Sequence, residues 1–259
     1  CTEETILLKG GAVMTLTIKN KQKILLVLKY VVITLSVILL AFPLYWMMVT
    51  ALTQRSSLLN NSNVLPQIKY FTFENFITII KTQPILTWFM NSMFVTVIST
   101  FLAIMVATMA GYSMSRFKYF STNLLGFFLL IVRMLPETLL VVPLYIMFSK
   151  FGLIDKYASL IISNITFVIP FAAWMMKSYF DGIPFSLEES ARIDGCNRFQ
   201  AVRKVVLPLT IPGLGATATY SAILCWSEFL FSRTFMMQPK NWTITVGISS
   251  LIGEYTIIW

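Results

Sequence analysis

Four long stretches of this sequence contain no Asp, Glu, Lys or Arg: residues 30–54, 82–115, 157–176 and 205–227. A helix needs about 20 apolar residues to cross the hydrocarbon core, because each residue rises about 1.5 Å. The chain is 57% hydrophobic and 12% charged, whereas soluble domains are about 25% charged. The stretches therefore indicate membrane spans, and they are helices because an open strand leaves its backbone unsatisfied in lipid.

A fifth span is predicted between the second and third stretches, although it carries Arg133 and Glu137, because its flanks are strongly apolar. The predicted spans are 30–52, 84–111, 123–148, 157–177 and 211–235. Prolines that can kink a helix fall inside them at Pro43, Pro136, Pro143 and Pro170. We therefore predict an all-α polytopic membrane protein, with a cytoplasmic N-terminal segment 1–29 followed by a membrane domain 30–259.

The distribution of positive charge predicts the orientation, since cytoplasmic loops are enriched in Lys and Arg. With the N-terminus inside, the inner segments hold the larger share of the 20 Lys and Arg residues. This places the protein in the cytoplasmic membrane with a cytoplasmic N-terminus. The net charge of +9 gives little reason to expect nucleic acid as a partner, because no basic face separates from the spans.

Several chemistries are excluded by residues that the sequence lacks. It contains no histidine, and its three cysteines lie far apart, at 1, 196 and 225. His-ligated metal sites, imidazole relays and a disulfide framework are therefore excluded. The sequence also lacks Gly-x-x-x-x-Gly-Lys-Ser/Thr, the loop that cradles nucleotide phosphates. If ATP drives this protein, it binds to a partner.

The polar segment between the fourth and fifth predicted spans has helix signals. Pro184 ends the preceding helix, and Ser186 with Glu189 matches a capping box. We expect a short helix from there to Asp194, ended by Gly195, since glycine adopts the left-handed conformation at little cost.

A second helix is predicted from Asn197, as N-cap, through Val206 to a stop at Pro208. Helical periodicity places Phe199, Val202 and Val206 on one face. An amphipathic hairpin on the inner leaflet explains this pattern as well. A helix-turn-helix for DNA is less favoured, because the segment is held between two spans.

The same segment carries a spaced motif: Glu-Ser-Ala from Glu189, three residues, Gly195, nine residues, then Val-x-Leu-Pro ending at Pro208. It resembles the EAA loop of permease subunits in ABC importers, with Ser190 and Val205 as mild departures. The resemblance extends over nearly the whole chain to the carbohydrate branch, the maltose-type second permease. The wider motifs are Phe73-x-Asn75-Phe76, Asn91-Ser92, Tyr112 with Arg116-Phe117, Met134-Leu135-Pro136, Pro143-Leu144-Tyr145, Phe180 with Ile183-Pro184 and Trp226-Ser227-Glu228-Phe229.

This resemblance implies the transmembrane domain of a type I importer, with six spans, of which the sixth would follow Trp259. It implies a second homologous permease, two cytoplasmic ATP-binding subunits and an external solute-binding protein as partners. ATP and Mg²⁺ would bind to the partner subunits, and this chain would bind no cofactor. The loop would dock on an ATP-binding subunit and transmit its movement. The implied coupling residues are Glu188, Glu189, Ser190, Ala191, Asp194, Gly195, Phe199, Leu207 and Pro208.

Polar groups within the spans are candidates for the solute path, because they are costly in lipid. These candidates are Asn91, Arg133, Glu137, Asn164, Trp226 and Glu228. Each also has a structural explanation: Arg133 can pair with Glu137, the asparagines can bond neighbouring helices, and Trp226 can anchor at the interface. The expected solute is a sugar or oligosaccharide. The alternatives are a phosphate ester or amino acid, or a membrane enzyme that uses the acidic residues of the loop.

Overall fold

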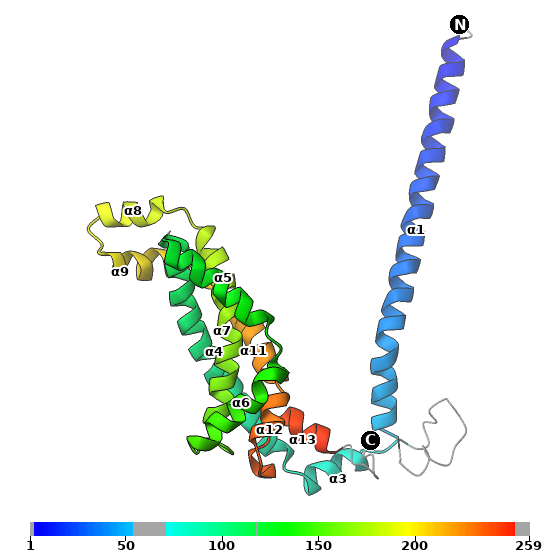
Figure 1. Cartoon of the computed structure of the whole chain (residues 1–259). Helices are drawn as coiled ribbons and strands as arrows, with labels where there is room; N and C mark the ends of the chain where they lie inside the picture. Colours follow the sequence, from blue (N-terminus) through cyan, green and yellow to red (C-terminus); the bar gives the residue numbers. More distant parts are fainter. Residues whose placement is uncertain (1–2, 54–70, 118, 252–259) are drawn as a thin grey trace. The chain divides into compact units, whose positions relative to one another are not determined.

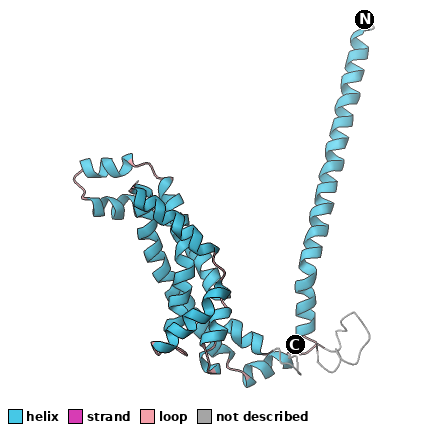
Figure 2. Cartoon of the chain, in the orientation of Figure 1, coloured by secondary structure: helices cyan, strands magenta, loops and turns pink. Residues whose placement is uncertain are grey.

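The computed structural model describes residues 3–53, 71–117 and 119–251, with the backbone alone described at 3–22, 24, 121 and 123. Among the described residues the regular secondary structure is helical, apart from one isolated β-bridge between Thr53 and Phe71, and loops join the helices (Figure 2). The chain divides into two units, residues 1–78 and 79–258. Each unit is described by itself.

The first unit is built on α1 (Glu3–Ala51). Helix α1 includes residues 3–29 of the predicted cytoplasmic N-terminal segment, and its part Leu25–Ala51 is long and apolar enough to cross a membrane. The side-chain amide of Asn75, in α3 (Glu74–Thr82), donates to the carbonyl oxygens of Ala51 and Thr53 at 3.1 and 3.0 Å. These bonds tie α3 to the end of α1.

Three helices form the centre of the second unit: α4 (Ile85–Arg116), α7 (Tyr157–Asp181) and α11 (Ile211–Ser227) (Figure 1). Fully buried small residues line their contacts, at Ala103, Ala107, Ala172 and Ala173. Small residues let helix backbones approach closely where lipid supplies no hydrophobic drive for association. At Gly111 a Cβ would lie 2.7 Å from the Cβ of Met176 and 2.8 Å from the amide nitrogen of Lys177. Helices α4 and α7 are thus in backbone contact there.

The third predicted span, 123–148, is two helices rather than one. Helices α5 (Phe120–Met134) and α6 (Glu137–Lys150) meet at 95°. The break is at Leu135 and Pro136, both extended, because proline lacks an amide hydrogen and disfavours the helical conformation of the preceding residue. The other three prolines, at 43, 143 and 170, lie inside continuous helices.

A second bend, of 70°, separates Arg198–Leu209 from α11. By length and composition the described residues supply three membrane-crossing helices, or up to five if each bent pair is one span. The fifth predicted span, 211–235, is also interrupted, because α11 ends at Ser227 and α12 (Leu230–Phe235) begins after a two-residue break.

Three short elements close one end of the unit. The 3₁₀ turn η3 (Pro239–Asn241) and α13 (Ile244–Ser250) contact the start of α4, whereas α12 contacts α6 and α7. The indole nitrogen of Trp88 donates to the carbonyl of Pro239 at 2.8 Å. The hydroxyl of Ser92 accepts the amide hydrogen of Ile244 at 2.8 Å. We call this the cap end. The predicted sixth span lies outside the described residues.

Candidate functional site

The predicted loop folds as a hairpin at the end of α4 and α7 opposite the cap end (Figure 1). The hairpin consists of α8 (Ser186–Ile193), α9 (Arg198–Ala201), the π-helical turn η2 (Val202–Val206) and α10 (Leu207–Leu209). The first helix has the predicted length. The predicted capping box of Ser186 is wrong, because Phe185 occupies the N-cap position and Ser186 is the first helical residue, with no side-chain cap.

The turn between the two arms follows the prediction. Gly195 has φ of +89°, in the left-handed region that favours glycine, and the amide of Cys196 donates to the carbonyl of Ala191 at 3.0 Å. Asn197 caps α9: its side-chain oxygen accepts the amide hydrogen of Gln200, and the Gln200 side chain accepts that of Asn197, both at 2.9 Å.

The second arm differs from the prediction beyond Ala201. Pro208 does not end the helix, because it lies in the first turn of α10, where no amide hydrogen is needed. The shared face predicted for Phe199, Val202 and Val206 is wrong. Phe199 is 73% exposed and Val206 is fully buried, because the π turn η2 has more residues per turn than an α-helix and shifts the later side chains around the axis.

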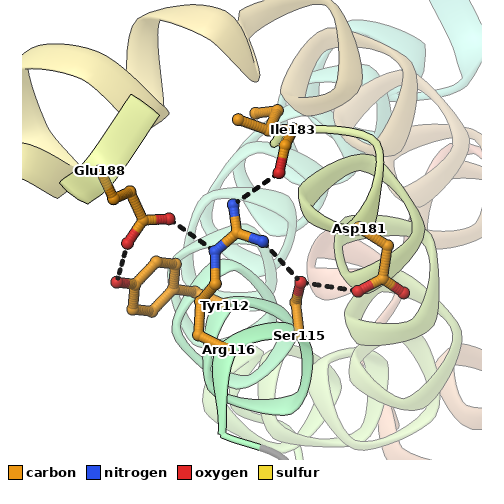
Figure 3. A network of polar contacts seen from close by, with 6 residues as sticks. All are labelled: Tyr112, Ser115, Arg116, Asp181, Ile183 and Glu188. Carbon is orange, nitrogen blue, oxygen red and sulfur yellow. Dashed lines mark hydrogen bonds and ion pairs between the residues drawn. The ribbon is translucent and has the colours of Figure 1, made fainter. Parts of the chain in front are cut away.

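A buried ion pair attaches the hairpin to the end of α4 (Figure 3). The Nε of Arg116 lies 2.5 Å from Oε1 of Glu188, and the side chains of the pair are only 8% and 5% exposed. The hydroxyl of Tyr112 donates to Oε2 of Glu188 at 2.9 Å, and Nη2 of Arg116 donates to the carbonyl of Ile183 at 3.1 Å. Both carboxylate oxygens of Glu188 are therefore bonded to side chains of the same chain.

The hairpin has an inner and an outer face. Glu188 and Ala191 point inward and are buried, whereas Glu189, Ser190 and Asp194 are exposed. Of the other predicted coupling residues, Gly195, Phe199 and Pro208 are exposed and Leu207 is half-buried. The outer face thus combines acidic residues with exposed apolar ones, as a protein-binding surface does.

Two features of this site were missed by sequence reasoning. Ile193 is 86% exposed at the tip of α8, and the amphipathic pattern of the eight-residue helix could have identified it. The second feature is the pair of residues that bind Glu188, since the sequence motif that contains them gave no indication of their role. Tyr112 and Arg116 are four residues apart and therefore share a helix face, but the sequence does not reveal which acid faces them.

A cavity of about 320 Å³ in the second unit is lined by four of the six path candidates. It is lined by Arg133 and Glu137 on either side of the α5–α6 break, by Asn164 of α7, and by Glu228 after α11. Nη1 of Arg133 lies 3.7 Å from Oε1 of Glu137, so the structural pairing predicted for them is present. The rings of Phe167, Phe229 and Phe231 also line the cavity.

The two remaining path candidates in the cavity, Glu228 and Asn164, differ in their hydrogen bonds. The Glu228 carboxylate accepts the amide hydrogens of Phe231 and Ser232 at 2.5 and 3.0 Å, and so caps α12. Asn164 is 5% exposed, and its amide has no hydrogen-bond partner in the described part of the chain. Buried amides are ordinarily bonded, so Asn164 has capacity for a ligand in the cavity.

The last two candidates, Asn91 and Trp226, lie outside this cavity. The Asn91 amide donates to the carbonyls of Lys240 and Trp242, both at 2.9 Å, and its oxygen accepts the Tyr157 hydroxyl at 2.8 Å. Trp226 packs edge-on to Phe89, with ring centroids 5.6 Å apart. Both side chains therefore make contacts that stabilise the fold. Among the described residues no cluster of His, Cys, Asp and Glu could hold a metal ion.

Comparison with known proteins gives consistent matches. Residues 99–258 match the family model described as binding-protein-dependent transport system inner membrane component. The inner membrane ABC transporter permease protein YcjP of Escherichia coli is 30% identical, over 93% of this chain and 86% of its own length. The trehalose/maltose transport system permease protein MalG of Thermococcus litoralis is 29% identical, over 88% and 84%.

Another relative is the sulfoquinovosyl glycerol transport system permease protein SmoH of Agrobacterium fabrum, 30% identical over 84% of this chain and 76% of its own length. Among solved structures, a bacterial ABC transporter involved in import of the acidic polysaccharide alginate has the same fold. Its TM-score is 0.77 at 19% identity, with 90% of this chain and 82% of that chain covered.

Proposed function

Because the chain belongs to the family of binding-protein-dependent transport system inner membrane components, we propose that it forms half of a saccharide path through the cytoplasmic membrane. Membership confirms the family and the all-α permease fold predicted from the sequence. It also makes the chain a multi-pass transport subunit of an ABC importer rather than a membrane enzyme. The remaining steps concern its partners, its coupling surface and its solute.

The partners are a second homologous permease, two cytoplasmic ATP-binding subunits and an external solute-binding protein. ATP and Mg²⁺ bind to the ATP-binding subunits, and the N-terminus is cytoplasmic. The single observation that carries the coupling role is the outer face of the hairpin. Ile193 and Phe199 are exposed there beside Glu189 and Asp194, and exposed apolar side chains rimmed by charge mark a docking surface.

The solute is a sugar or oligosaccharide. Two relatives are named for trehalose/maltose and sulfoquinovosyl glycerol transport, and these names favour a saccharide over a phosphate ester or an amino acid. The cavity supports this assignment by its chemistry. It offers hydrogen-bonding groups at Asn164, Arg133 and Glu137 beside aromatic rings, and precisely placed polar groups on an apolar wall are typical of small-molecule sites.

Photo-crosslinking in the assembled transporter tests the coupling role. A photoreactive residue in place of Ile193, at the tip of α8, should capture an ATP-binding subunit in native membranes. The matched control replaces Ile248 of α13, which is 53% exposed at the cap end and should capture none. Failure of position 193 to capture an ATP-binding subunit would contradict the proposal.

Charge reversal gives a second test of the same surface. Glu189→Lys should reduce co-purification of the ATP-binding subunits and, with it, solute uptake, since the outer face loses an acid. Glu74→Lys reverses another exposed acid, in α3, and should leave both unchanged. Equal uptake by the two variants would argue against docking through Glu189.

A further inference from the structure

We propose that Glu188 and Arg116 are positioning residues that transmit movement of the hairpin to α4, and that Glu188 does not contact the ATP-binding subunit. This inference rests on the proposed function, because it assumes that a motor subunit displaces the outer face. It separates two adjacent acids that were both expected to be coupling residues, although the motif itself begins at Glu189. Glu189 lies on the outer face, whereas Glu188 lies on the inner face against α4.

The local geometry supports a rigid connection. A buried ion pair is favourable only where further hydrogen bonds satisfy both groups. Here Oε1 of Glu188 meets Arg116, Oε2 accepts the Tyr112 hydroxyl, and Arg116 also donates to Ile183 (Figure 3). Charge-assisted bonds of this kind are shorter and stronger than neutral ones. The inner face of α8 is thus held in one orientation relative to α4.

The covalent connection between α7 and α8 is less rigid than the Arg116–Glu188 ion pair. Only residues 182–185 join α7 to α8, and no nearby stretch of chain joins α8 to α4. A short connecting segment can bend when a partner pushes on the outer face. The Arg116–Glu188 pair bypasses that segment, so displacement of α8 reaches the end of α4 directly.

Helix α4 cannot move there without α7. The Ser115 hydroxyl donates to Oδ1 of Asp181 at 2.6 Å, and one turn earlier Gly111 brings the two backbones into contact. Packed helices of this kind respond as a unit, because close-packed interfaces deform little. A push on the hairpin therefore moves the α4–α7 pair, and α7 carries Asn164 of the cavity.

The test uses the complete transporter in proteoliposomes and measures solute transported per ATP hydrolysed, normalised to assembled complex. Glu188→Gln should lower this ratio at least about fivefold, the lower end of typical coupling between sites, while the ATP-binding subunits still co-purify. Lys150→Gln is the control, because it removes an exposed charge at the end of α6, on the side of the cap end and away from the hairpin. It should leave the ratio unchanged.

A double variant separates positioning from general stability. If Arg116 and Glu188 act as one connection, combining Arg116→Gln with Glu188→Gln should lower the ratio no further than the worse single variant. If the Glu188→Gln variant does not assemble, Tyr112→Phe replaces it as the test. That change removes only the hydroxyl that donates to Glu188, and it should still lower the ratio. A wild-type ratio in an assembled Glu188 or Tyr112 variant, or additive losses in the double variant, would overturn the inference.

The outcomes also distinguish this inference from the proposed function. If the unaltered chain fails to co-purify with ATP-binding subunits, the proposed function fails. If it co-purifies and transports, yet the variants keep the wild-type ratio, only the positioning role of Glu188 and Arg116 fails.

Discussion

At the scale of single residues, similar side chains have different uses in this molecule. Asn91 and Asn164 are both buried asparagines in predicted spans. Asn91 has three partners within the chain and holds the cap end to α4 and α7. Asn164 has none in the described residues and faces a cavity. The sequence offered both as solute ligands, because residue type and depth alone cannot show which amide the fold uses.

We therefore predict that Asn91→Leu destabilises the fold. Two carbonyls and the Tyr157 hydroxyl would lose their partner, and each buried polar group left unsatisfied costs about 1–3 kcal/mol. Thermal unfolding of the detergent-solubilised transporter measures the loss. Met90→Leu, a neighbouring change at an exposed position, should have little effect. An unchanged melting temperature in the Asn91 variant would contradict the structural role.

At the scale of elements, hydropathy located the helices and left their breaks undetermined. The apolar stretches predicted α1, α4 and α7, because hydrocarbon requires long apolar helices. Of the four prolines expected to kink a helix, only Pro136 stands at a sharp bend. The effect of a proline depends on whether its neighbours re-satisfy the freed backbone groups, which is a property of packing and not of the local sequence.

The contact between α4 and α7 leads to a prediction about packing. Gly111→Ala should destabilise the transporter by about 1–3 kcal/mol, since its methyl group meets the Lys177 backbone and overpacking costs about that much. Gly126→Ala in α5 is the matched control. Its Cβ would lie 3.5 Å from the sulfur of Met114, an ordinary contact.

Both substitutions raise helix propensity equally, so the difference in melting temperature between the two variants isolates the steric effect. If Gly111→Ala melts at the same temperature as Gly126→Ala, the two backbones are not in contact in solution.

At the scale of the whole molecule, the candidate site is assembled from segments far apart in the sequence. The cavity combines the α5–α6 break, α7 and the segment after α11. The sequence predicted four of its polar residues because ionisable and amide groups are costly in lipid. It could not predict that Glu188 faces inward and Glu189 outward. Adjacent residues point about 100° apart around a helix axis, but only packing determines how the helix is rotated relative to the rest of the bundle.

The cavity leads to a prediction about solute recognition. Asn164→Ala should raise the solute concentration required for half-maximal uptake several-fold and leave assembly intact, since its amide has no partner in the described chain to lose. A hydrogen bond to a neutral ligand group contributes about 0.5–1.5 kcal/mol. Ser163→Ala is the control, because the Ser163 hydroxyl bonds the carbonyl of Ser159 in its own helix. Identical uptake curves for the two variants would remove Asn164 from the solute path.

The exposed tip of the hairpin has a consequence for the chain before it meets its partners. Ile193 and Phe199 are 86% and 73% exposed, and under the proposed coupling role they stay uncovered until an ATP-binding subunit docks. Uncovered apolar side chains of this size promote self-association. A cell that makes this chain in excess of the ATP-binding subunits would accumulate unassembled permease that self-associates, so balanced synthesis of the subunits limits aggregation in the membrane.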